Sequence, residues 1–302
     1  MGYLQEMDTV TSQAAGRGVV WDLARPREQA LPAVFASPHS GNRYPSAFVA
    51  SARLDALSLR KSEDCFVDEI FAGVAEEGAP LLKALFPRAY LDPNREPFEL
   101  DPAMFGDALP AYANTRSPRV AAGLGTIARV VANGEEIYRA KLSFAEALER
   151  VEALYRPYHA VLESLVEGTV ERFGYAMLID CHSMPSIGGP MDEDAGRRRD
   201  DIVLGDCHGT SCAAPLTALV ERFLVELGYQ VGRNIPYAGG FTTRHYGRPR
   251  ASVHALQIEI NRALYMDEAT LERGPGLPRL MRDMRNLAHH LRLRLPALLR
   301  AA

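Results

Sequence analysis

Three side chains in the sequence are suited to metal-assisted hydrolysis: Glu259, His39 and His182. Glu259 lies in an apolar stretch between Ile258 and Ile260, and strand alternation would direct it to the face opposite these two isoleucines. A carboxylate on such a face is costly to desolvate unless something cationic, such as a metal ion, lies opposite. The pattern suggests the general base and acid of a metal hydrolase. The alternative is a strand glutamate that pairs with an arginine.

The two histidines follow short apolar runs that we expect to be buried strands. His39 comes after the run 33–36, and His182 comes after the run 176–179. Imidazole is the commonest protein ligand of catalytic divalent metals, and a catalytic zinc site commonly takes two histidines and one carboxylate. Asp180 would then orient His182 through its second ring nitrogen. Each histidine could instead be an ordinary hydrogen-bonded residue.

The carboxylate ligand is expected from the segment SEDCFVDEIFAGVAEEG, which has the pattern of a helix from Ser62 to Gly78. Ser62 is a good N-cap, acidic residues fill the first turn, and Gly78 is a typical stop. Asp64 in the first turn is the expected third ligand. Asp68, one turn later, is the alternative, or a supporting or capping group. Both residues also fit the charged start of an ordinary helix.

Other nucleophilic side chains lack the partners that catalysis requires. Cys207 and Cys212 neighbour His208, but no base held by a third group is evident near them. Ser40 and Ser183 stand beside histidines rather than in a strand-to-helix elbow. A metal hydrolase is therefore favoured over a thiol or serine enzyme.

The elements that must position these residues predict an α/β protein. A capping box of Ser143 and Glu146 begins a long amphipathic helix that ends at Gly174, and Pro157 must kink or interrupt it. Because strands alternate with helices, we expect a mixed, mostly parallel central sheet with helices on both faces. The remaining predicted segments are strands at 19–21 and 89–91, an irregular stretch at 98–117, and a helix at 213–227. We expect one domain, 1–302, with an N-terminal arm (1–30) and a C-terminal helix (277–302).

Composition narrows the classes of function. The net charge is −4 and the isoelectric point is about 6.1, so no basic surface for nucleic acid is expected. No apolar run approaches the roughly 20 residues that span a bilayer, and the start of the sequence resembles no signal peptide. The four cysteines form no CxxC pair. We therefore expect a cytoplasmic protein with reduced thiols that binds no membrane; its oligomeric state is not readable.

Six motifs, from about His39 to Glu268, resemble the N-formylglutamate amidohydrolase (N-formylglutamate deformylase) family: SPHSGNRYP, SEDCFVDEIF, FPRAYLDPNR, DCHSMP, NIPYAGGFTTRHYGRP and HALQIEINRALYMDE. The family is distantly related to zinc carboxypeptidases and aspartoacylase, so the resemblance implies a phosphorylase/hydrolase-like α/β sheet. It also implies zinc ligands at His39 and His182, with Glu259 as the catalytic carboxylate. Zinc carboxypeptidases begin their site with His-x-x-Glu, whereas this chain has Asn42, and Asp64 is therefore the expected carboxylate ligand.

The resemblance implies zinc-dependent hydrolysis of N-formyl-L-glutamate to L-glutamate and formate, in histidine degradation. Zinc would lower the pKa of a water molecule, while Glu259 would take the proton and return it to the departing nitrogen. The substrate carries two carboxylates, so at least two cationic sites are needed. The candidates are Arg95, Arg244 and Arg262. Asn94 beside Arg95 is similar to the Asn-Arg pair that grips the terminal carboxylate in zinc carboxypeptidases.

Two alternatives to this function remain open. One is a related amidohydrolase that acts on another N-acyl amino acid, such as N-formylaspartate or an N-acetyl analogue, because one methyl group is worth only about 1–3 kcal/mol of discrimination. The other is a non-catalytic protein on the same fold that binds a dicarboxylate through its arginines. The presence of Glu259 together with both histidines favours an enzyme.

Overall fold

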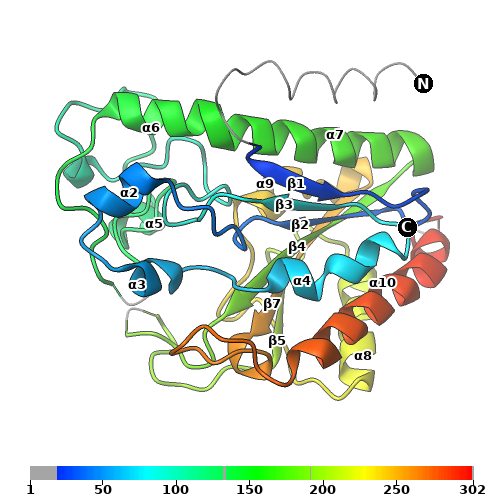
Figure 1. Cartoon of the computed structure of the whole chain (residues 1–302). Helices are drawn as coiled ribbons and strands as arrows, with labels where there is room; N and C mark the ends of the chain where they lie inside the picture. The colour runs from blue at the N-terminus through cyan, green and yellow to red at the C-terminus, as the bar shows by residue number, and fades with distance from the viewer. Residues whose placement is uncertain (1–18, 132–133, 191, 301–302) are drawn as a thin grey trace.

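The computed structural model describes residues 19–131, 134–190 and 192–300, and these residues form a seven-stranded sheet in the order β1-β3-β2-β4-β7-β5-β6 (Figure 1). Four strand pairs are parallel (β2–β3, β2–β4, β4–β7 and β5–β6), and two are antiparallel (β1–β3 and β5–β7). The expected mixed, mostly parallel sheet is confirmed. The strands are β1 (Trp21–Ala24), β2 (Ala33–Ser37), β3 (Leu81–Ala84), β4 (Ala176–Met184), β5 (Ile202–Gly205), β6 (Val231–Arg233) and β7 (Val253–Asn261).

Helices cover both faces of this sheet, as expected (Figure 1). Strand alternation explains the two cores: in β7, Ile258 and Ile260 pack on one side, while Val253 and Ala255 pack on the other. The first core is shared with α4 (Val67–Ile70), α8 (Ala214–Glu226) and α10 (Leu277–Arg300). The second is shared with α6 (Phe144–Arg150), α7 (Arg156–Phe173) and α9 (Phe241–Tyr246). Shorter helices are α2 (Ser46–Ser51), α3 (Ala56–Arg60) and α5 (Pro118–Ala121).

The long helix formed by α6 and α7 begins, and is interrupted, where the sequence predicts. The Ser143 hydroxyl and the Glu146 carboxylate form the expected capping box at the start of α6. The helix then passes through one π-helical segment, Val151–Tyr155, and continues as α7 with Pro157 in its first turn. Because proline cannot donate a backbone hydrogen bond, the interruption falls just before it.

The helix predicted from Ser62 to Gly78 is wrong in its first turn. α4 begins only at Val67, its N-cap is Phe66 in a left-handed conformation, and a short 3-10 turn (Ala72–Ala75) follows. The preceding residues are held by long-range hydrogen bonds instead: the Arg262 guanidinium donates to the carbonyls of residues 61 and 63. These tertiary bonds outweigh the local helical preference.

Three strand predictions also need correction. Residues 89–91 form no strand, because the backbone amides of Tyr90 and Leu91 donate to the Pro87 carbonyl in a tight turn; β3 lies earlier in the chain. The strand expected at 19–21 is β1, which begins only at Trp21. β4 continues to Met184 rather than ending at residue 179, because β7 pairs with it along its whole length.

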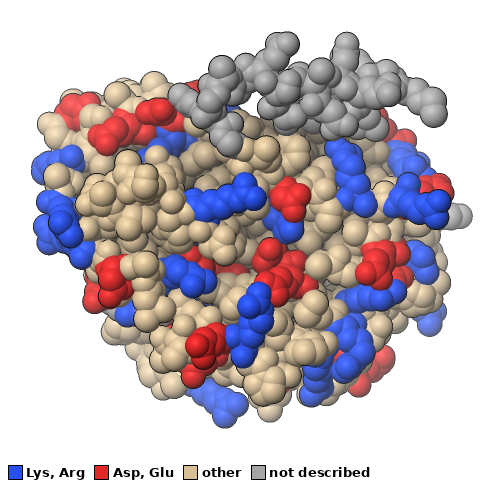
Figure 2. Space-filling model, viewed as in Figure 1, with Lys and Arg blue, Asp and Glu red and all other residues tan. Residues whose placement is uncertain are grey.

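The segments that follow the parallel strands lie at one edge of the sheet. The neighbours of β2 are β3 on one side and β4 on the other, so the strand order reverses there, which is where α/β sheets usually bind ligands. In the part of the chain that the structure describes, no helix is both long and apolar enough to cross a membrane. On the face drawn in Figure 2, basic and acidic side chains are interspersed.

Candidate active site

Two histidines and an aspartate converge beyond the carboxyl end of β2. His39 follows β2, His182 lies in the last residues of β4, and Asp64 lies in the loop before α4. Asp64 Oδ2 is 3.0 Å from His182 Nδ1 and 3.4 Å from His39 Nδ1. All three residues are buried, and their facing atoms lie within 4.8 Å of one another, as metal ligands would. The structure thus groups Asp64, and not Asp68, with the histidines.

Each imidazole also contacts a carboxylate through its other ring nitrogen, Nε2. His39 Nε2 is 2.7 Å from Asp92 Oδ1, and His182 Nε2 is 3.0 Å from Asp180 Oδ2. We place a proton on each Nε2, because a carboxylate can only accept a hydrogen bond. Each Nδ1 then faces Asp64, where it would offer its lone pair to a bound cation. Metal-bound histidines are commonly oriented by such carboxylates.

The donor set fits a divalent cation. His39 Nδ1 is buried and has no hydrogen-bond partner among the described residues. Burial alone would raise the pKa of Asp64, but the neighbouring imidazoles of His182 and His39 hold it well below its usual range. For His182, burial lowers the pKa, yet Asp180 and Asp64 outweigh this and hold it well above its usual range. The environment therefore favours positive charge beside Asp64, and two imidazole nitrogens with one carboxylate are typical ligands of a catalytic zinc ion.

Arg262 binds the oxygen of Asp64 that does not face the histidines, Oδ1. Arg262 Nη2 lies 3.1 Å from Asp64 Oδ1 and also donates to the Glu63 carbonyl. Its Nη1 donates to the Lys61 carbonyl and its Nε to the Ser183 hydroxyl. Because every nitrogen of the guanidinium is engaged with the protein, Arg262 is built to position Asp64.

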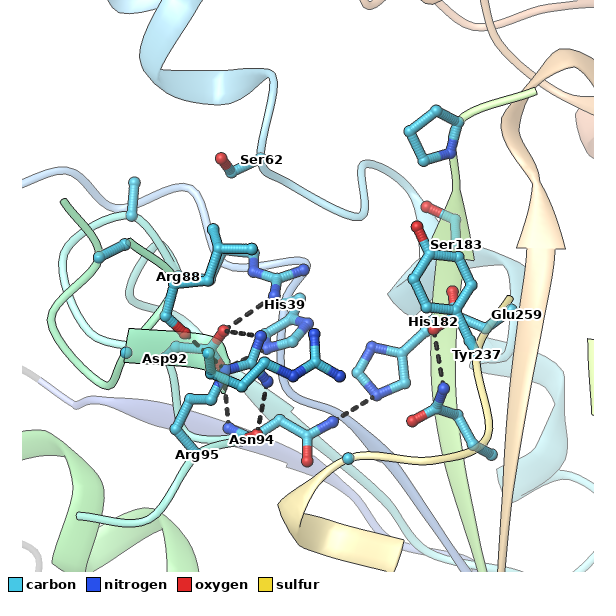
Figure 3. Close-up of a pocket in the computed structure, with 18 of the residues that line it drawn as sticks. His39, Ser62, Arg88, Asp92, Asn94, Arg95, His182, Ser183, Tyr237 and Glu259 are labelled. Atoms are coloured by element: carbon cyan, nitrogen blue, oxygen red, sulfur yellow. Dashed lines mark hydrogen bonds and ion pairs between the residues drawn. The ribbon is translucent and has the colours of Figure 1, made fainter. Parts of the chain in front are cut away.

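Glu259, on β7, lines a cavity together with His39 and His182 (Figure 3). It pairs in register with His182 on β4, and its Oε1 accepts a hydrogen bond from Gln257 Nε2 at 2.9 Å. Burial, opposed by the His182 charge and reinforced by Asp64, raises the pKa of Glu259 to about 7. A carboxyl group in this environment can both accept and donate a proton near neutral pH.

The loop after β3 brings Asn94 and Arg95 to the cavity. Asn94 Nδ2 lies 3.1 Å from His182 Nε2 and 3.2 Å from Asp180 Oδ2 (Figure 3). Its Oδ1 accepts from the Thr242 backbone amide, and a Cβ at Gly240 would lie 2.3 Å from this oxygen, so only glycine allows the approach. The buried Arg95 donates Nε to the Leu124 carbonyl and Nη1 to the Asn94 carbonyl.

The cavity between these groups has a volume of about 180 Å³. Figure 3 shows Arg88 and Arg95 on the side opposite Tyr237 and Glu259. The volume is below the roughly 300–1,000 Å³ of pockets for drug-sized ligands, so a small molecule is favoured. Arg244 is exposed, donates to the Gly239 carbonyl, and is not among the residues that line the cavity.

Sequence reasoning missed several residues that line this cavity. Five of these are Arg88, Asp92, Arg119, Tyr237 and Gln257. A signal for the first two was present, because both lie in the motif FPRAYLDPNR next to Asn94 and Arg95. Gln257 could have been found from strand alternation, which places it on the same face of β7 as Glu259.

The other nucleophile candidates do not form a catalytic pair. The Ser40 hydroxyl contacts Ser37 Oγ and the Asp64 carbonyl. Cys212 is buried, and burial raises the pKa of its thiol to about 12. Cys207 Sγ donates a hydrogen bond to the Thr243 hydroxyl at 3.6 Å. These contacts give no support to a thiol or serine mechanism.

Comparisons with known proteins relate the chain to one enzyme family. A family model described as N-formylglutamate amidohydrolase matches residues 31–266. The chain is 30% identical over 241 residues to the N-formylglutamate deformylases of Pseudomonas putida and Pseudomonas aeruginosa, covering 79% of this chain and 83% of each relative. A solved structure, the N-formylglutamate amidohydrolase from Ralstonia eutropha JMP134, is 40% identical with a TM-score of 0.83, covering 93% of this chain and 99% of that one.

Proposed function

Because the chain belongs to the N-formylglutamate amidohydrolase family, we propose that it hydrolyses N-formyl-L-glutamate to L-glutamate and formate with the help of one zinc ion. The observation that supports this most is the convergence of His39, Asp64 and His182, because both histidines line one cavity with Glu259. We propose these three residues as the zinc ligands. Following the family resemblance alone, we assign the reaction to histidine degradation.

The chain's own residues supply the proton transfers of this reaction. When bound, zinc would polarise the formyl group and lower the pKa of a water molecule. Glu259 takes a proton from that water while the water oxygen attacks the formyl carbon. It then passes the proton to the departing nitrogen, which makes the amine a competent leaving group. The hydrogen bond from Gln257 keeps the carboxylate directed into the cavity.

The substrate carboxylates require cations that the protein has not already neutralised. Arg95 Nη2 lies 3.6 Å from Asp92 Oδ2, beyond a hydrogen bond, and so retains donors for a ligand. We propose that Arg95, with Asn94 beside it, binds one substrate carboxylate. We assign Arg262 to holding Asp64 instead, and we propose no substrate contact for the exposed Arg244.

A panel of small acyl amino acids tests this function. The purified protein is incubated with N-formylglutamate, N-formylaspartate and N-acetylglutamate, and released formate or acetate is measured. We expect the highest kcat/KM for N-formylglutamate. A higher value for another member of the panel would transfer the proposal to that substrate, and no release from any member would reject hydrolysis of these amides.

A further inference from the structure

Arg119 is a cation in the cavity wall, and it has no anionic partner among the residues that the structure describes. It lies on α5, is half-buried and lines the cavity with Arg95 and Glu259. Within the described ranges, no hydrogen bond or ion pair involves its guanidinium group. Arg88 and Arg262, by contrast, contact the carboxylates of Asp92 and Asp64. Arg119 is therefore the lining arginine with the most capacity to bind an anion.

The backbone fixes Arg119 relative to Arg95. The Ser117 hydroxyl accepts a hydrogen bond from the Val120 amide at the start of α5, with Pro118 in the first turn. The Arg119 carbonyl accepts a hydrogen bond from the Leu124 amide at 2.8 Å. The Leu124 carbonyl in turn accepts from Arg95 Nε at 2.8 Å. One short loop thus connects the two arginines and holds the spacing between them.

The charges of these two arginines repel each other. Burial is the largest cause that lowers the pKa of Arg95, to about 10, and the nearby positive charge of Arg119 adds to it, while Asp92 opposes it. A bound anion would relieve this repulsion. Asp192, an acid that also lines the cavity, does not serve as that anion, because its carboxylate lies 2.7 Å from Arg199 Nη2.

We propose that Arg119 binds the side-chain carboxylate of the substrate and so determines the preference for an acidic amino acid. This inference rests on the proposed function and adds a residue that determines specificity. Arg95 adjoins Asn94, which contacts His182. We therefore assign Arg95 to the α-carboxylate, which lies next to the reacting amide. Arg119 makes no direct contact with the three proposed zinc ligands among the interactions described, which suits the far end of the substrate.

The first experiment compares a diacid with its neutral isostere. Arg119→Ala and Arg119→Lys are assayed with N-formylglutamate and N-formylglutamine, beside the control Arg116→Ala, which alters an exposed arginine on the same segment. For Arg119→Ala we expect kcat/KM to fall about 10- to 100-fold with N-formylglutamate, as for a lost charged hydrogen bond. With N-formylglutamine we expect a change of no more than about twofold, and Arg119→Lys should recover part of the loss. Equal losses on both compounds, or no loss on either, would overturn the role.

A binding experiment separates this role from the proposed function. Glutarate and glutaramate are titrated calorimetrically into the wild-type protein and Arg119→Ala, with thermal unfolding as a check on folding. Weaker binding of glutarate but not of glutaramate by the variant supports Arg119 as a carboxylate site, even if no formyl compound is hydrolysed. Equal affinities of both proteins for glutarate would reject that site, even if N-formylglutamate is hydrolysed.

Discussion

The two sides of the cavity differ in how far their polar groups are satisfied by the protein. On the histidine side, an aspartate contacts the Nε2 atom of each imidazole, and the two Nδ1 atoms face one Asp64 oxygen. The arginines, in contrast, differ in how many of their guanidinium nitrogens have hydrogen-bond partners in the protein. Arg262 is fully engaged, Arg95 is partly engaged, and the guanidinium of Arg119 has no partner among the described residues.

This difference separates groups that shape the site from groups that meet the ligand. A donor already held by several buried protein atoms gives little additional binding energy, but it fixes the geometry of its partner. A donor without a protein partner, in contrast, carries a desolvation cost that a ligand can remove. The contacts of each side chain, rather than its chemical type alone, therefore assign its role.

The largest effect is expected at Glu259, which lies across the cavity from Arg88 and Arg95. Glu259→Gln keeps the shape of the side chain but removes its proton transfer, so kcat should fall by about 10²- to 10⁴-fold. Metal content should be unchanged, because Glu259 is not among the grouped ligands. The exposed Glu272→Gln is the control. Deformylation by Glu259→Gln at a rate near that of the wild type would remove Glu259 from the mechanism.

Arg262 tests whether a fully engaged arginine acts on the protein rather than on the substrate. Arg262→Ala leaves the buried Asp64 without its cation, which should lower the free energy of unfolding by about 3–5 kcal/mol. Metal content should fall as well, because Asp64 loses its position. Chemical denaturation and metal analysis measure both effects. A stable variant with normal metal content and only a raised KM would instead make Arg262 a substrate clamp.

Asp92 tests the support behind the histidine side. Asp92→Asn keeps the shape but weakens the acceptor for His39 Nε2, so affinity for zinc should fall about 10- to 100-fold. Asp180→Asn should act in the same way on His182. Competition with a chelator measures these affinities. The control is Asp22→Asn, because Asp22 lies in β1 with an exposed side chain. Unchanged affinity in both variants would show that the aspartates do not support metal binding.

The smallest effect is expected at Arg244. Because this residue is exposed and absent from the cavity wall, Arg244→Ala should change kcat/KM for N-formylglutamate by no more than about twofold. A steady-state assay beside Arg95→Ala provides the comparison. A tenfold rise in KM for Arg244→Ala would mean that α9 moves towards the ligand on binding.

Local patterns in the sequence were enough to predict the sheet class, the capping box and the face of β7 that carries Glu259. They grouped His39 with His182 because both follow buried apolar runs. Asp64 joins them for a different reason from the one predicted: it lies in a loop bound by Arg262 rather than in a helical turn. Asp92 was missed because its contact with His39 spans 53 residues, and no local period encodes such a contact.

The zinc dependence of turnover tests the proposed metal-dependent hydrolysis most directly. The protein is stripped with a chelator, zinc is returned stepwise, and bound zinc and formate release from N-formylglutamate are measured together. We expect activity to rise with bound zinc up to about one ion per chain, and we expect His182→Ala neither to bind the ion nor to recover activity. Full activity in the stripped wild-type protein would contradict this expectation.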